Sequence, residues 1–142
     1  MYPLSERSPN CQGDTSGNAE SWWIMTFQEL VEEARKTVRE MHAAEIEAHM
    51  PDALFADVRE IDEWNEGHIP DAIHVPLSKI DTLADPNSMD STSKITQRRD
   101  EPIVVYCEVG RRSLLAGKTL QELGYTNVVS LKGGYSLWKM RR

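Results

Sequence analysis

A cysteine follows directly on an apolar run that predicts a buried strand, and its thiol could act there as a nucleophile. The run is IVVY at 103–106, and a short segment separates it from a predicted helix. That segment consists of Cys107, Glu108, Val109, Gly110, Arg111 and Arg112. A thiol attacks as its thiolate, and a helix N-terminus with cationic neighbours favours the thiolate form. This order of strand, cysteine, basic loop and helix predicts a reactive thiol.

The loop after Cys107 has the composition of an anion-binding site. We expect Ser113 to be the N-cap of the following helix, so that several backbone N–H groups point into the loop. Gly110 can adopt a positive φ, which lets the backbone curve around a bound group. The alternative is that Cys107 is only a small buried apolar side chain, the commoner role of a single cysteine inside a strand. Its position at the strand end, before a basic loop, favours the nucleophile.

Short strands that alternate with helices predict the frame that holds this loop. The predicted strands lie at 53–57, 72–75, 103–106 and 127–131, and the main predicted helices at 26–45, 78–83, 113–123 and 135–142. Gly124 is expected to end the third of these helices. Short apolar strands without alternation indicate an α/β fold with a mainly parallel central sheet and helices on both faces. Ligands bind beyond the carboxyl ends of such strands, where Asp57, Arg59 and Cys107 lie.

One stretch is predicted to be well ordered as a helix, and another is predicted to be poorly ordered. Thr26 and Glu29 form a capping box at the start of the helix over 26–45. That helix carries apolar residues at helical spacing, namely Phe27, Leu30, Val31, Ala34, Val38 and Met41. The segment 84–101 is polar and rich in turn residues, so it is predicted to be the least ordered internal stretch.

The composition indicates one soluble domain. The 142 residues are 39% hydrophobic, and the net charge of −7 argues against nucleic acid as a partner. No apolar run is long enough to span a membrane, and the first residues lack a secretory signal. We expect a disordered N-terminal tail at 1–21 and a folded domain at 22–142. With only Cys11 and Cys107, no disulfide framework is expected, which favours the reducing cytoplasm.

Three segments, taken in order, resemble the signature regions of a single-domain rhodanese. They are DVREIDEWNEGHIPDAIHVP, IVVYCEVGRRS and LKGGYSLW, and the resemblance covers about 54–138. It implies a rhodanese-like fold and sulfurtransferase activity without a metal or an organic cofactor. Cys107 would take the outer sulfur of a donor such as thiosulfate as a persulfide and pass it to cyanide, to a small thiol or to a protein acceptor.

The resemblance also implies roles for the residues around Cys107. The loop 107–112 would bind the substrate, with Arg111 and Arg112 holding an anionic donor. Glu108 would oppose a dianionic donor, which implies either a less charged donor or a side chain that faces outward. Asp57 and Arg59 would brace the pocket together with Ser113. His68 belongs to a Gly-His-Ile turn that is structural in this family, and Gly133 and Gly134 would let the backbone approach the loop.

Three other functions compete with sulfur transfer. A cysteine phosphatase uses Cys-x5-Arg, but the position required for its arginine is occupied by Ser113. A partner-dependent persulfide carrier or a regulatory binding module is the alternative from another class, and the 84–101 loop could serve docking. Metal binding lacks the usual patterns of cysteine and histidine spacing. Cys11 could resolve the persulfide as a disulfide, although a thiol without that role is the simpler interpretation.

Overall fold

A five-stranded parallel sheet forms the centre of the molecule. The computed structural model describes residues 25–141, and the strand order is β1-β5-β4-β2-β3. Every neighbouring pair runs parallel. The strands are β1 Arg39–Met41, β2 Leu54–Asp57, β3 Ile73–His74, β4 Ile103–Tyr106 and β5 Val128–Leu131. The predicted α/β class with its parallel sheet is confirmed, and β4, which is buried at all four positions, lies in the middle of it.

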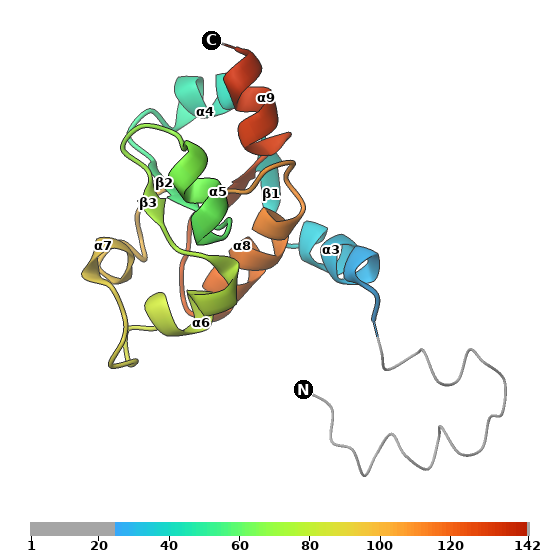
Figure 1. Ribbon diagram of the computed structural model, residues 1–142. Coiled ribbons are helices and arrows are strands. Elements are labelled where there is room, and N and C mark those ends of the chain that lie inside the picture. Colours follow the sequence, from blue (N-terminus) through green and yellow to red (C-terminus); the bar gives the residue numbers. More distant parts are fainter. Residues whose placement is uncertain (1–24, 142) are drawn as a thin grey trace, which may run out of the picture.

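Helices cover both faces of the sheet, with α4 and α9 lying together at one end of the view and α3 beside α8 (Figure 1). The helices are α3 Phe27–Arg35, α4 Ala43–His49, α5 Ile61–Glu66, η1 Leu77–Lys79, α6 Ile80–Leu83, α7 Ser93–Thr96, α8 Arg112–Glu122 and α9 Gly134–Met140. Within residues 25–141 no helix is both long and apolar enough to cross a membrane. The predicted tail at 1–21, with Cys11, lies outside the described residues.

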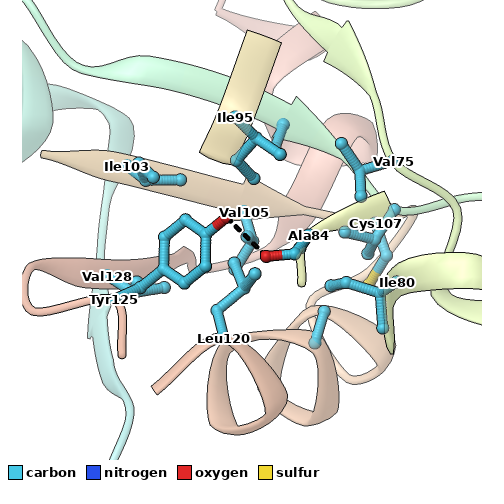
Figure 2. Close-up of a cluster of buried hydrophobic side chains, with 13 residues drawn as sticks. Val75, Ile80, Ala84, Ile95, Ile103, Val105, Cys107, Leu120, Tyr125 and Val128 are labelled. Atoms are coloured by element: carbon cyan, nitrogen blue, oxygen red, sulfur yellow. Dashed lines mark hydrogen bonds between the residues drawn. The ribbon is translucent and has the colours of Figure 1, made fainter. Parts of the chain in front are cut away.

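Alternate residues of β4 enter two separate cores because successive side chains of a strand point to opposite faces. Ile103 and Val105 belong to the core under α6, α7 and α8, whereas Val104 and Tyr106 belong to the core under α4 and α9. Figure 2 shows the first core, in which Cys107 lies at one end beside Ile80. Cys107 therefore directly follows the most fully buried strand of the sheet, which fixes the position of its backbone.

The predicted helix over 26–45 is wrong, because the chain contains two helices with a strand between them. The capping box of Thr26 and Glu29 is present and α3 ends at Arg35. Residues 39–41 then pair with 129–131 of β5 as an edge strand. Val38 packs between α3 and α8, while Met41 enters the core under α4 and α9. Backbone pairing along the sheet edge outweighs the helical propensity of this stretch.

The segment 84–101 is also more ordered than predicted. It contains the short helix α7, and Ile95 of that helix is fully buried in the core. Ala84 is fully buried too, and its carbonyl accepts a hydrogen bond of 2.8 Å from the Tyr125 hydroxyl (Figure 2). Burial raises the pKa of Tyr125 to about 12. A few apolar anchors thus fix a polar segment onto the core.

Candidate active site

The sulfur of Cys107 lies inside a loop whose backbone N–H groups point toward it. The N–H groups of Gly110 and Ser113 donate to Cys107 Sγ over 3.1 and 3.3 Å. Gly110 has φ +98°, the left-handed conformation that turns its N–H inward. Cys107 and Ser113 are both fully buried. This arrangement favours negative charge on the sulfur.

The prediction that Ser113 is an N-cap is wrong. The helix α8 begins at Arg112, and Arg111 occupies the cap position without a side-chain capping bond. Ser113 is therefore the second residue of the helix, and its free N–H donates to the sulfur. The Ser113 hydroxyl lies 2.7 Å from the Ser130 hydroxyl and 3.5 Å from Cys107 Sγ. Ser130 was not predicted, because only the sheet brings β5 beside this loop.

The N-terminus of α9 is hydrogen-bonded to the backbone of the Cys107 loop. The N–H groups of Tyr135 and Ser136 donate to the carbonyls of Cys107 and Glu108 over 2.8 and 3.0 Å. Gly134 lies at this junction with φ +62°, and a Cβ there would come within 2.5 Å of the Cys107 carbonyl oxygen. A side chain at this position would push the two backbones apart, so the close approach requires glycine.

We expect Gly134→Ala to destabilise the protein by about 2–4 kcal/mol, because it adds left-handed strain and breaks hydrogen bonds of the loop. Urea unfolding measures the loss. Gly124→Ala is the matched control: it also has a positive φ, but its Cβ would meet only the flexible end of Arg99, at 3.1 Å. The control should lose about 1 kcal/mol. Equal losses in the two variants would contradict the supporting role of this junction.

Asp57 and Arg59 form a buried ion pair below the loop. Arg59 Nη2 lies 2.8 Å from Asp57 Oδ2, and Arg59 Nε lies 3.1 Å from both carboxylate oxygens. Asp57 is fully buried and Arg59 is 2% exposed. Burial alone would lower the pKa of Arg59, but the hydrogen bonds and charge of Asp57 outweigh it and raise that pKa. Arg59 Nη2 also donates to the Gly67 carbonyl over 2.6 Å, which ties α5 to the pair.

Glu108 is held by Arg59 and Ser136. Its Oε1 accepts from Arg59 Nη1 over 3.0 Å, and its Oε2 accepts from the Ser136 hydroxyl over 2.5 Å. Its negative charge is therefore paired and directed toward β2 and α9. Val109, the next residue of the loop, is 55% exposed.

The two arginines of the loop have separate partners. Arg112 forms a bidentate pair with Glu63 of α5, in which both N–O distances are 2.9 Å. The hydrogen bonds from Arg112 hold the pKa of Glu63 below its usual value. Arg111 is exposed and lies over the ring of Phe27, 5.6 Å from its centroid. Glu63 was not predicted as a site residue, since it lies 49 positions from Arg112.

A pocket of about 450 Å³ borders the loop. It is lined by Arg59, Glu63, Glu66, Gly67, Glu108, Tyr135 and Lys139. His68 is not among these residues, and its ring stacks on that of Trp64 with 3.4 Å between centroids. Among the residues that the structure describes, no group of three or more acidic, cysteine or histidine side chains could hold a metal ion.

Comparison with known proteins gives the family. The rhodanese-like domain model matches residues 41–141. The chain is 32% identical over 88 residues to the thiosulfate sulfurtransferase GlpE of Coxiella burnetii, covering 62% of this chain and 73% of that protein. It is also 34% identical over 88 residues to a Schizosaccharomyces pombe protein provisionally named a mitochondrial thiosulfate sulfurtransferase. That match covers 60% of this chain and 62% of the yeast protein. The chain thus spans less than two thirds of the yeast relative.

Solved structures share the fold. A protein of unknown function from Rhodopseudomonas palustris, named as a possible tyrosine phosphatase, superposes with a TM-score of 0.75 at 24% identity, covering 83% of this chain and 92% of that one. A rhodanese-related protein from Thermoplasma volcanium gives a TM-score of 0.58 at 28% identity, covering 72% and 92%. The first likeness is evidence for the fold alone. The predicted rhodanese-like fold is confirmed.

Proposed function

Because the chain belongs to the rhodanese-like domain family, we propose that it is a sulfurtransferase in which Cys107 carries the transferred sulfur as a persulfide. The observation that carries this proposal is the convergence of the Gly110 and Ser113 N–H groups on Cys107 Sγ. A persulfide anion is small and gains from such donors. The relatives named as thiosulfate sulfurtransferases support the same reaction class.

The reaction proceeds in two displacements through a covalent intermediate. The Cys107 thiolate attacks the outer sulfur of thiosulfate, a new S–S bond forms, and the S–S bond of the donor breaks so that sulfite leaves with its electron pair. Cyanide, or a thiolate of a cellular acceptor, then attacks the outer sulfur of the persulfide. The Cys107 thiolate leaves and is regenerated, so no external oxidant or reductant is needed.

The surroundings of the sulfur favour sulfur transfer over phosphate transfer. The position at which a cysteine phosphatase requires an arginine holds Ser113, and its hydroxyl bonds Ser130 inside the core. No guanidinium is therefore available from that position to bind a phosphate. The proposal includes a small-molecule sulfur donor and an acceptor that is either a small molecule or another protein. It also includes a cytoplasmic location for the reaction.

Steady-state kinetics with thiosulfate and cyanide test the proposal. We expect parallel lines in double-reciprocal plots, since sulfite leaves before cyanide reacts. An aryl phosphate should not be hydrolysed faster by the wild type than by Cys107→Ser. Hydrolysis of the phosphate that depends on Cys107, without formation of thiocyanate, would contradict the proposed function.

A further inference from the structure

The Glu63–Arg112 ion pair lies between α5 and the N-terminus of α8, at the end of the loop that carries the sulfur. Two parallel N–H···O bonds of 2.9 Å join the side chains, which are 31% and 32% exposed. A bidentate pair of this kind is the strongest arrangement of arginine with a carboxylate. With Glu63 ionised and Arg112 protonated, the net charge of the pair is zero.

Arg112 directly precedes Ser113, whose N–H donates to Cys107 Sγ over 3.3 Å. The hydrogen bonds that Arg112 donates to Glu63 raise the pKa of Arg112 above its usual value, and the charge of a Cys107 thiolate contributes to the same rise. The guanidinium that could best attract an anionic donor to the sulfur is thus the one that Glu63 neutralises. Glu63 also lines the pocket that borders the loop.

Three other cations lie in or near the loop. Arg111 is exposed and lies over the ring of Phe27, 5.6 Å from its centroid. Arg59 is paired with both Asp57 and Glu108. Lys139 lies over the ring of Tyr135, 4.9 Å from its centroid, in a pocket whose lining also includes three carboxylates. A dianion that enters this pocket therefore meets two cations, Arg59 and Lys139, and three carboxylates.

We propose that Glu63 determines which sulfur donors the site accepts, an inference that rests on the sulfurtransferase function proposed above. By pairing with Arg112, Glu63 lowers the affinity for dianionic thiosulfate and favours donors with one negative charge or none, such as the persulfide of cysteine. The Cys107 thiolate attacks the outer sulfur of such a persulfide. The S–S bond of the donor breaks, and its thiolate leaves with the electron pair.

Glu63→Gln removes the charge while keeping the shape of the side chain. Glu63 Oε1 also accepts the Glu60 N–H over 3.2 Å as part of the capping box of α5, and a glutamine can keep that bond. Asp62→Asn is the matched control, because it removes one negative charge from the neighbouring exposed position of the same helix. Both variants are made in the full chain with Cys11→Ser, which leaves Cys107 as the single thiol.

Two readouts separate the charge effect from turnover. The first is the ratio of the rates at which iodoacetate and iodoacetamide alkylate Cys107, since these reagents differ mainly in charge. Glu63→Gln should raise this ratio by about fivefold, and Asp62→Asn by less than about twofold. The second is kcat/KM for sulfur transfer to cyanide. Glu63→Gln should raise it about tenfold with thiosulfate, chiefly through KM, and less than about twofold with a cysteine persulfide.

The outcomes distinguish this proposal from the function on which it rests. An alkylation ratio that does not change in Glu63→Gln, or that changes equally in Asp62→Asn, overturns the role of Glu63 whatever the turnover. An equal gain with both donors overturns it as well. If the proposed function fails instead, no donor transfers sulfur in any variant, while the alkylation ratio still responds to Glu63 alone and supports its control of anion access.

Discussion

Cys107→Ser is expected to lower kcat/KM for sulfur transfer from thiosulfate to cyanide by at least about a thousandfold, since a hydroxyl cannot replace the thiolate as the attacking and leaving group. The Cys107 side chain is fully buried, and its sulfur accepts hydrogen bonds from the N–H groups of Gly110 and Ser113. A hydroxyl oxygen can accept the same hydrogen bonds. We therefore expect the variant to fold. Thiocyanate formation gives the rate, and the thermal unfolding midpoint tests whether the fold is kept.

Cys11→Ser provides the control for this experiment. It removes the other cysteine of the chain and should leave kcat/KM within about twofold, because no step of the proposed reaction uses it. Substantial activity in a folded Cys107→Ser variant would show that the reaction does not pass through Cys107. If Cys11→Ser lost activity while Cys107→Ser kept it, the transferred sulfur would be carried by Cys11.

Arg59→Met should cost about 3–5 kcal/mol of unfolding free energy, because it leaves the carboxylate of Asp57 buried without its partner. Asp57 is fully buried, and Arg59 donates to it from Nε and Nη2 as well as from its backbone. The variant also loses the bond from Arg59 to Glu108 in the loop. Urea unfolding at neutral pH measures the change.

The double variant Asp57→Leu/Arg59→Met separates an unpaired charge from lost packing. Removing both charges should recover at least about 1 kcal/mol relative to Arg59→Met, because no buried ion then lacks a partner. Arg39→Met changes an exposed arginine and should stay within about 0.5 kcal/mol of the wild type. A double variant less stable than Arg59→Met would contradict the view that the unpaired carboxylate causes the loss.

Local patterns predict the part of the site that a single segment of chain builds. The strand Ile103–Tyr106, the cysteine after it and the helix that follows are contiguous, so an apolar run and a glycine-containing loop were sufficient. The capping box of Thr26 predicts where α3 begins but not where it ends. The end at Arg35 depends on pairing of the next residues with β5, which lies far away in the sequence.

The parts of the site that tertiary contacts build could not be predicted in this way. Glu63 and Ser136 bind loop residues that are 49 and 28 positions away. No rule of sequence spacing predicts either pair, because only the folded sheet brings α5 and α9 to the loop. The sequence left two interpretations of Glu108 open, a less charged donor or a side chain that faces outward, because the partners that hold its carboxylate depend on those same contacts.

Intact-protein mass spectrometry after incubation with excess thiosulfate tests most directly whether Cys107 carries the sulfur. We predict that the wild type and Cys11→Ser each gain the mass of one sulfur atom, that cyanide removes it, and that Cys107→Ser gains nothing. The same gain should follow treatment with a cysteine persulfide. A folded wild type that gains no sulfur from either donor, or a gain that persists in Cys107→Ser, would contradict the persulfide mechanism.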